Sequence, residues 1–309
     1  MDKNDEFNKF WNKKIEFINT VSLNYNLTKT SFSTFDNIEY YDLYFTSFDG
    51  AKIYAKYLKN KKIRKNIPKN KKIPVLFYFH GYPASSRNWL EKTAYCSLGY
   101  DIIAMDFRGQ GGLSEDIGGV KGATAFGHII AGIDDDISNM IYVKNILDMC
   151  LLVKIVQTFP DIDRYNLNSF GASQGGAFSL ICAALNKDIK KCISLYPFLS
   201  DFKKIYDLDK DIGAYEELRL YSRWFNVDGK LDSNLFNKLS FIDSKNFAPK
   251  ISAKVLFGIS ALDSDCPVET QYALFNNISS EKKLCLYKKY SHEDIPPFGN
   301  EVLSFLLEQ

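Results

Sequence analysis

The sequence predicts an α/β fold, with a mostly parallel central sheet and helices on both faces of the sheet. Short and nearly continuous apolar runs recur along the chain, and residues 73–80 (IPVLFYFH) are the clearest example. Such runs are typical of strands that are covered on both faces. Helical patterns separate these runs, and this alternation is typical of βαβ units. Because no linker or internal repeat divides the 309 residues, we expect residues 1–309 to form a single domain.

The composition limits the possible partners of the chain. Lysine and arginine number 39 against 37 aspartates and glutamates, so no overall field draws the chain to nucleic acid or to a membrane. The charged N-terminus does not resemble a signal peptide, and no apolar run is long enough to span a bilayer, which predicts a cytoplasmic protein. We expect no metal and no cofactor, because the cysteines lack metal-ligand spacing and resemble small buried hydrophobic residues. The six cysteines are at positions 96, 150, 182, 192, 266 and 285.

The N-terminal part predicts an arm followed by an antiparallel hairpin at one edge of the sheet. Residues 7–18 carry apolar side chains at helical spacing, and residues 1–36 together form the expected arm. Two alternating runs flank the turn signal Phe48-Asp49-Gly50, which indicates a hairpin. The expected elements are a helix at 7–18, a polar surface loop at 21–36, strands at 38–46 and 53–58, and a charged, solvated connection at 59–72.

The remainder of the chain alternates between strands and helices. The expected strands are at 73–80, 100–107, 164–172, 191–196, 254–260 and 284–290, and the expected helices are at 89–97, 137–159, 177–185, 268–277 and 301–307. The loop at 108–131 is rich in glycine and too long for a simple connection, and loops of this length are usually functional. Residues 200–245 are polar with scattered aromatic side chains, and we expect them to form a cap-like helical insertion over the site.

One serine lies in a sequence typical of a nucleophile. Gly171-Ala172-Ser173-Gln174-Gly175 has the form G-x-S-x-G between an expected strand and an expected helix, which is the signature of a nucleophile elbow. A turn this tight strains the backbone of Ser173 and requires residues without bulk two positions on either side. The same pattern also fits an ordinary glycine-rich loop, so the assignment depends on an acid and a histidine farther along the chain.

Both partners follow in the required order. Asp263 is the first carboxylate after the expected strand at 254–260, and Asp265 is the alternative two positions later. His292 lies in the loop after the next strand, and the order Ser…Asp…His is the one that α/β-hydrolases use. We therefore predict that His292 removes the proton of the Ser173 hydroxyl and that Asp263 orients the imidazole.

A serine nucleophile of this kind also needs donors for the oxyanion. The backbone N–H of Gln174, directly after the nucleophile, is one expected donor. Tyr82 supplies the other, because it follows the strand at 73–80 and the preceding Gly81 lets the backbone approach. We expect His80 to be a structural residue that forms hydrogen bonds.

Four motifs in this order give a more specific resemblance. They are His80-Gly81-Tyr82, Arg108-Gly109-Gln110, the elbow at 171–176 and His292-Glu293. With residues 196–200 and 262–267, they resemble the acetyl xylan esterase/cephalosporin C deacetylase family, carbohydrate esterase family seven, over nearly the whole chain. The resemblance implies an α/β-hydrolase that removes acetyl groups from small O-acetylated sugars and cephalosporin C through an acyl-serine. It also implies a cytoplasmic homohexamer whose active sites face a central chamber that excludes polymers.

The resemblance also assigns roles to residues. It implies a triad of Ser173, Asp263 and His292, with Tyr82 and Gln174 as oxyanion donors. Arg108, Gly109 and Gln110 are implied to be structural, since a guanidinium orders loops through several hydrogen bonds at once. Pro197 is implied to line a narrow acyl pocket.

Three departures from the family pattern leave the triad intact but affect the expected substrate preference and oligomer. Ala172 stands where glycine is usual, Gly127-His128 where Gly-Trp is expected, and residues 140–143 replace an aromatic-plus-arginine run. Two alternatives remain open. One is an α/β-hydrolase that acts on other esters or on peptides, because a triad does not identify the acyl group. The other is a catalytically inactive homologue that functions in binding.

Overall fold

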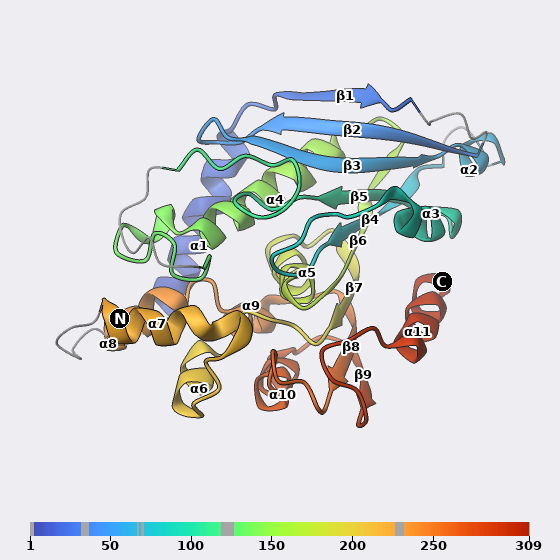
Figure 1. Cartoon of the computed structure of the whole chain (residues 1–309). Coiled ribbons are helices and arrows are strands. Elements are labelled where there is room, and N and C mark those ends of the chain that lie inside the picture. The colour runs from blue at the N-terminus through green and yellow to red at the C-terminus, as the bar shows by residue number, and fades with distance from the viewer. Residues whose placement is uncertain are drawn as a thin grey trace.

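The computed structural model describes residues 3–31, 37–66, 68, 71–118, 127–225 and 232–308. In this part of the chain, nine strands form one sheet in the order β1-β2-β3-β5-β4-β6-β7-β8-β9 (Figure 1). The strands are β1 (Tyr25–Lys29), β2 (Ile38–Thr46), β3 (Lys52–Asn60), β4 (Ile73–Phe79), β5 (Asp101–Met105), β6 (Ile162–Ala172), β7 (Ile189–Leu195), β8 (Lys254–Ser260) and β9 (Lys282–Tyr287). The strands from β5 to β9 in this order pair in parallel, whereas β1, β2, β3 and β5 pair antiparallel. The predicted α/β fold with an antiparallel hairpin is confirmed.

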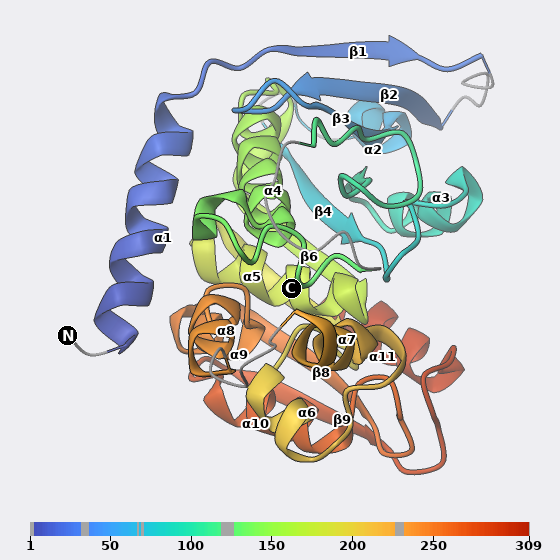
Figure 2. The same cartoon turned by 60° about the vertical axis from the view of Figure 1, so that its left-hand side comes forward.

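Helices cover both faces of the sheet (Figures 1 and 2). The longer ones are α1 (Lys3–Thr20), α3 (Trp89–Ser97), α4 (Ile141–Gln157), α5 (Gln174–Leu185), α10 (Val268–Asn277) and α11 (Pro296–Leu307). The segment between β7 and β8 contains α6 (Phe202–Asp207), α7 (Glu216–Trp224), α8 (Asp232–Leu239) and α9 (Ser244–Phe247). Among the residues that the structure describes, no helix has the length and apolar character needed to cross a membrane.

The central strands face a hydrophobic core on each side. In β4, Phe77 and Phe79 belong to the larger core, which also contains residues of α4 and α5, whereas Leu76 belongs to the smaller core under α3 and α11. Successive side chains of a strand point to opposite faces, so a strand between two cores needs apolar residues at every position. This requirement explains why residues 73–79 form an almost unbroken apolar run.

The arm helix is confirmed, and it is anchored to distant segments. The indole of Trp11 is fully buried and donates a hydrogen bond of 3.0 Å to the carbonyl of Phe241. At the other end of α1, the ammonium of Lys154 on α4 donates to the carbonyls of Ile18 and Asn19. A cation at this position compensates the last carbonyl groups of the helix, so α1 lies along α4 (Figure 2).

The prediction of a polar loop at 21–36 was wrong in its first part, because Tyr25–Lys29 forms the edge strand β1. Its Leu27 pairs with Leu43 of β2 and is the one residue of this strand that is not exposed. An edge strand that is exposed on both faces needs no alternation of apolar residues, since its pairing comes from backbone hydrogen bonds. The sequence pattern therefore gave no strand signal here. Residues 32–36 lie outside the described part of the chain.

The charged connection expected at 59–72 contains one further helix, α2 (Lys61–Asn66). The guanidinium of Arg64 donates to both carboxylate oxygens of Asp101, at 2.7 and 2.6 Å, and the Asp101 side chain is fully buried. A buried carboxylate requires such a partner. This ion pair fixes a segment that composition alone describes as solvated; residues 67, 69 and 70 lie outside the described residues.

The helix expected at 137–159 is interrupted. A short 3₁₀ turn at Ile137–Asn139 precedes α4, and Met140 between them is extended, with ψ 133°. The N–H of Ile141 donates to the carbonyl of Ala131 at 3.1 Å, so a long-range contact replaces the helical bond that continuous helix would require. The last helix begins at Pro296, five residues earlier than the expected 301, because proline is well tolerated in the first turn.

The parallel strands place the predicted residues at one edge of the sheet. Strands β4, β6 and β8 end at Phe79, Ala172 and Ser260, and β9 ends at Tyr287. The carboxyl ends of parallel strands lie at the same edge, where α/β proteins bind ligands. The loops that follow these strands carry the predicted donors, nucleophile, acid and base.

Candidate active site

Ser173 occupies the turn between β6 and α5. Its backbone has φ 57° and ψ −123°, a conformation that residues with a side chain rarely adopt. Three backbone hydrogen bonds hold the turn: the Ser173 N–H donates to Leu195 (3.0 Å), and the Ser173 carbonyl accepts from Ala177 (3.1 Å) and Phe198 (3.0 Å). A strained residue that its surroundings hold this firmly is typical of a functional site.

The two glycines of the elbow are required by close backbone contacts. A Cβ on Gly175 would lie 2.0 Å from the carbonyl oxygen of Phe79 at the end of β4. A Cβ on Gly171 would lie 2.4 Å from the carbonyl group of Gly175. Because backbone atoms cannot yield to such contacts, the spacing G-x-S-x-G follows from the packing of α5 against β4 and β6.

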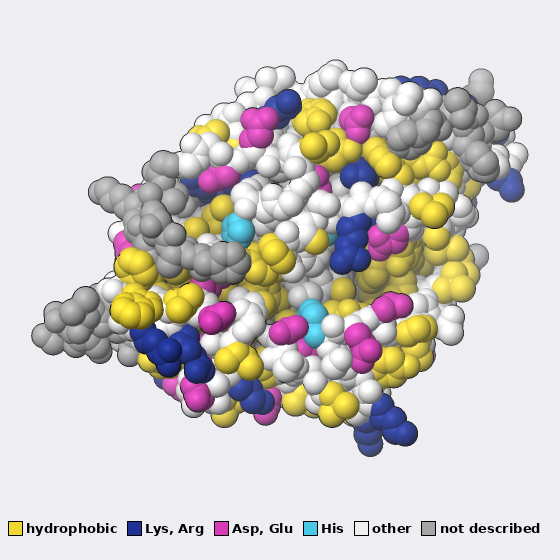
Figure 3. Space-filling view, in the orientation of Figure 1, with side chains coloured by type: hydrophobic (Ala, Val, Ile, Leu, Met, Phe, Trp, Pro, Cys, Tyr) yellow, Lys and Arg dark blue, Asp and Glu magenta, His cyan; other side chains and the backbone are white. Residues whose placement is uncertain are grey.

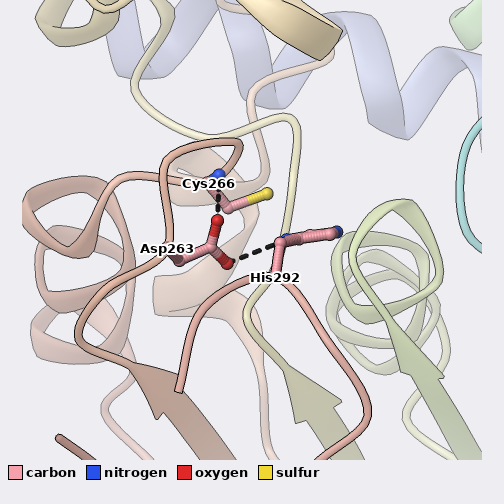
Figure 4. A group of neighbouring side chains, drawn as sticks. All are labelled: Asp263, Cys266 and His292. Atoms are coloured by element: carbon pink, nitrogen blue, oxygen red, sulfur yellow. Dashed lines mark hydrogen bonds and ion pairs between the residues drawn. The ribbon is translucent and has the colours of Figure 1, made fainter. Parts of the chain in front are cut away.

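The structure brings Asp263 to His292. The Nδ1 atom of His292 lies 2.8 Å from the Oδ2 atom of Asp263, whose side chain is fully buried (Figure 4). A carboxylate can only accept, so Nδ1 carries the proton and Nε2 of the neutral imidazole is left as an acceptor.

The alternative acid, Asp265, does not reach His292 in this way. Its backbone N–H, together with that of Cys266, donates to Oδ1 of Asp263, at 2.9 and 2.7 Å. The carboxylate of Asp265 instead lies near Gly213, because a Cβ added to Gly213 would be 2.8 Å from its Oδ1 atom. The geometry therefore distinguishes the two carboxylates that the sequence left open.

The side chain of Cys266 lies close to those of Asp263 and His292, and the sequence analysis did not predict this. It is fully buried, as expected, and the Ser173 side chain lies near its thiol. Burial and the nearby Asp263 raise the pKa of this thiol. One potential metal-ligand atom each from Asp263, Cys266 and His292 lies within 4.8 Å of the others. The available signal was its position three residues after the predicted acid.

Tyr196 also contacts the imidazole of His292, and the sequence analysis did not predict this contact. Its ring lies 4.5 Å from the imidazole of His292, measured between centroids, and its hydroxyl donates to the carbonyl of Glu293 at 2.9 Å. The residue directly follows β7, the strand next to the elbow, and it begins the segment 196–200 that contributed to the family resemblance. Tyr196 thus packs against the imidazole ring.

The two expected oxyanion donors border the elbow. A Cβ on Gly81 would lie 3.8 Å from Cβ of Ser173, so the loop that carries Tyr82 passes directly against the nucleophile position. Gln174 is the first residue of α5, where a backbone N–H has no acceptor within the helix. Its side chain exchanges two hydrogen bonds with Gln110 (2.8 and 2.9 Å) and accepts one from the hydroxyl of Tyr142 (2.7 Å).

His80 has contacts typical of a structural residue. Its Nε2 accepts from the N–H of Phe107 at 3.1 Å, so Nδ1 carries the proton and donates to the carbonyl of Gly81 at 2.8 Å. Burial lowers the pKa of this imidazole to about 4, which keeps it neutral. His80 thereby connects the loops after β4 and β5.

Tyr82 is linked to α7 through His128. The Nδ1 atom of His128 lies 3.0 Å from the Tyr82 hydroxyl, and its Nε2 donates to the carbonyl of Gly109. Glu217 of α7 accepts from the backbone N–H groups of His128 (3.1 Å) and Ile130 (2.9 Å). Burial raises the pKa of Glu217 to about 8, although these hydrogen bonds oppose the shift. No sequence motif indicated this link.

Arg108 is fully enclosed by carboxylates. Its guanidinium donates to both oxygens of Asp148 (2.7 and 2.8 Å) and both oxygens of Asp49 (2.7 and 3.1 Å). The side chains of Arg108 and Asp148 are entirely buried. Gly109, which follows, has φ 72°, and a Cβ there would lie 2.6 Å from Ile141. These contacts fix the start of the long loop after β5 against α4.

Ser173 and His292 open onto the same cavity, which has a volume of about 640 Å³. Figure 3 shows this face of the molecule hollowed, with hydrophobic side chains in the hollow and charged side chains along its edges. Besides these two residues, the lining includes aromatic side chains and charged groups, among them Tyr78, Tyr95, Phe170, Tyr196, Phe298, Arg87, Glu91 and Asp294.

Two predicted features do not line this cavity. Pro197 is buried beside the start of α5, where a Cβ on Gly176 would lie 3.3 Å from its Cα, and it is not among the lining residues. No described residue between 200 and 245 lines the cavity either. The acyl pocket at Pro197 and the capping role of residues 200–245 therefore stay predictions.

The family model that matches this chain and two similar solved structures are all acetyl xylan esterases. The family model described as acetyl xylan esterase (AXE1) matches residues 1–309. The crystal structure of acetyl xylan esterase 1 from Thermoanaerobacterium sp. is 41% identical, with a TM-score of 0.92, and the alignment covers 98% of this chain and 93% of that one. An acetyl xylan esterase from Paenibacillus sp. is 26% identical, with a TM-score of 0.91 and coverage of 97% and 93%.

More distant similarities complete this comparison. The acetyl esterase Axe7A of Xylanibacter ruminicola is 25% identical over 284 residues, which are 90% of this chain and 61% of that protein. This chain therefore matches less than two thirds of the length of that relative. An α/β-hydrolase from Penicillium sp. is 16% identical, with a TM-score of 0.57 over 86% of this chain and 97% of that one, a similarity that shows the fold alone.

Proposed function

The chain belongs to the acetyl xylan esterase (AXE1) family of carboxylic ester hydrolases, and from this premise we propose that it is a serine esterase that removes acetyl groups from small O-acetylated sugars. One observation carries the proposal: Ser173 and His292 line the same cavity, and the buried carboxylate of Asp263 is hydrogen-bonded to Nδ1 of the imidazole. This arrangement supports nucleophilic catalysis, in which a base activates a hydroxyl and a third group orients the base.

The proposed reaction has two halves. The Ser173 hydroxyl attacks the acetyl carbonyl while Nε2 of His292 takes its proton, and the N–H groups of Gln174 and Tyr82 stabilise the oxyanion. The tetrahedral intermediate then collapses, the sugar oxygen leaves with the proton from His292, and acetyl-Ser173 remains. In the second half, His292 takes a proton from water, the resulting nucleophile attacks the acyl-serine, and His292 returns the proton to the Ser173 oxygen as acetate is released. Asp263 stabilises the imidazolium in both halves.

The cavity supports a carbohydrate alcohol as the leaving group. At about 640 Å³ it is much larger than an acetyl group, so most of its space serves the alcohol side of the ester. Rings of Tyr78, Tyr95 and Tyr196 provide apolar faces with polar edges, a combination that suits sugar rings. Acetylated xylo-oligosaccharides are therefore the proposed substrates, with cephalosporin C as a further substrate expected from the family resemblance. The homohexamer and the cytoplasmic location also stay predictions.

The test compares the wild type with Ser173→Ala on p-nitrophenyl acetate and on acetylated xylo-oligosaccharides. Ser291→Ala is the matched control, because this serine adjoins His292 but its hydroxyl donates to Glu293. We expect Ser173→Ala to abolish turnover and Ser291→Ala to retain it. A Ser173→Ala variant with the wild-type rate would overturn the proposal. Faster turnover of butyryl esters or aminoacyl substrates than of acetyl esters would instead assign the site to another hydrolase class.

A further inference from the structure

The thiol of Cys266 lies close to Asp263 and His292, the proposed acid and base. Asp263 and Cys266 lie on the loop after β8, and His292 lies on the loop after β9 (Figure 4). One nitrogen, one oxygen and one sulfur atom of these residues lie within 4.8 Å of one another. The Ser173 side chain is near enough to influence the pKa of the same thiol. The other described cysteines have no such grouping with histidine and carboxylate ligands.

From this arrangement we propose that Asp263, Cys266 and His292 form a binding site for a thiophilic divalent cation of the Zn²⁺ type, and that metal binding reversibly inhibits the esterase. The inhibition, though not the binding, rests on the proposed function. Thiolate, imidazole and carboxylate are the ligands that Zn²⁺ takes in proteins. Two anionic ligands also neutralise the charge of the ion, which a buried site requires.

The geometry needs only small movements to accept the ion. Bond lengths of about 2.0–2.3 Å place neighbouring ligand atoms of a tetrahedral zinc site about 3.3–3.6 Å apart. The His292–Asp263 contact of 2.8 Å must therefore open slightly, and the contacts to sulfur, at most 4.8 Å, must close by about an ångström. The His292 side chain is 23% exposed, so it borders the cavity from which the ion enters.

The loop after β8 presents two of the ligands in fixed positions. Oδ1 of Asp263 accepts from the N–H groups of Asp265 and Cys266, which leaves Oδ2 for the metal. The same contact holds Cys266 next to Asp263. A water molecule or the Ser173 hydroxyl completes the fourth position. Three protein ligands and one exchangeable ligand are typical of accessible zinc sites.

Metal binding prevents His292 from acting as a base. The ion takes the lone pair of Nδ1, so the proton of the neutral imidazole moves to Nε2, which then cannot accept the proton of Ser173. The thiol of Cys266 releases one proton to solvent, since a coordinating thiol is deprotonated. No bond to substrate forms, and a chelator that removes the ion restores the original protons and the activity.

The experiment titrates the enzyme with Zn²⁺ and follows both activity and the ultraviolet charge-transfer absorption of Cd²⁺ bound to thiolate. Cys266→Ala is the test variant and Cys285→Ala the matched control, because Cys285 is also buried but lies in β9. Loss of even an outer-shell partner weakens metal binding by about 10–100-fold, so we expect Cys266→Ala to raise the half-inhibiting Zn²⁺ concentration at least about tenfold. We expect wild-type sensitivity in Cys285→Ala, full recovery with a chelator and no inhibition by Mg²⁺.

The absorption measurement separates this proposal from the proposed function. Ser173→Ala retains the three protein ligands, so the cadmium band should persist in a protein without esterase activity. Cys266→Ser, which is nearly isosteric, should lose the band and provides a folded variant if Cys266→Ala does not fold. Equal Zn²⁺ sensitivity of the wild type and Cys266→Ala, or the same cadmium band in the wild type and Cys266→Ser, would overturn the proposed site.

Discussion

Asp263→Asn should inactivate the enzyme through the tautomer of His292. In the wild type, Oδ1 of Asp263 accepts two backbone N–H bonds and Oδ2 faces Nδ1 of His292 at 2.8 Å. Only the oxygen of an asparagine can accept those two bonds, so its NH₂ group must face His292. Nδ1 then accepts a hydrogen bond, and the imidazole proton moves to Nε2. The base that Ser173 needs is lost although the fold is unchanged.

The magnitude follows from the role of the carboxylate. In serine hydrolases, this substitution lowers kcat by about 10⁴-fold, which is about 5.5 kcal/mol of transition-state stabilisation. The side chain of Asp263 is fully buried, so solvent does not screen the interaction. We therefore expect a loss of this order in kcat, with KM for p-nitrophenyl acetate changing less than about threefold, because the substitution does not touch the binding surface.

Asp265→Asn provides the control, as an identical chemical change two residues away. Asp265 contributes its backbone N–H to the Asp263 carboxylate, and its own side chain lies beside Gly213. Its kcat should stay within about threefold of the wild type. Steady-state kinetics, circular dichroism and thermal unfolding of both variants form the assay. A folded Asp263→Asn with near wild-type kcat, or an equal loss in Asp265→Asn, would refute the reasoning.

Three further predictions concern the supports of the site. Arg108→Met leaves the buried Asp148 without its cation, so the free energy of unfolding in urea should fall by about 3–5 kcal/mol. Gly175→Ala places a Cβ 2.0 Å from a backbone oxygen, so the same measurement should show a loss of about 1–3 kcal/mol or more, together with the loss of esterase activity. Burial raises the folded-state pKa of Glu217 to about 8, so wild-type stability is fully present below the ordinary value of 4.5 and declines as pH rises through 8. Glu217→Gln should remove that decline, at most about 5 kcal/mol, in urea unfolding compared at pH 5 and pH 9; identical pH dependence in both proteins would contradict it.

The placement of Asp263 and His292 could be predicted because it depends on strand ends. Buried parallel strands need apolar residues on both faces, so their ends are visible in the sequence as the points where apolar runs stop. The first acid after residues 254–260 had to lie at the same edge of the sheet as Ser173. The order Ser…Asp…His along the chain then pointed to His292, and a hydrogen bond of 2.8 Å joins His292 to Asp263.

Features that depend on long-range contacts could not be predicted in this way. Tyr25–Lys29 becomes a strand only because β2 offers it a free edge. The contact between Glu217 and the backbone of His128 joins residues that are 89 positions apart and follows no periodic pattern. Cys266 resembles a small hydrophobic residue in composition and in burial, and only the placement of His292 gives its thiol a possible ligand role.

Two of the three departures from the family pattern lie next to the proposed oxyanion donors. His128, which stands where the tryptophan of a Gly-Trp pair was expected, contacts the hydroxyl of Tyr82, and Tyr142, within the departing segment 140–143, donates to the side chain of Gln174. Each of these two departures thus contacts one of the two proposed oxyanion donors, and neither contacts Asp263 or the imidazole of His292 in the described hydrogen bonds. We therefore expect any difference in acyl preference between this chain and its relatives to arise from how Tyr82 and Gln174 are held, and not from the proposed triad of Ser173, Asp263 and His292.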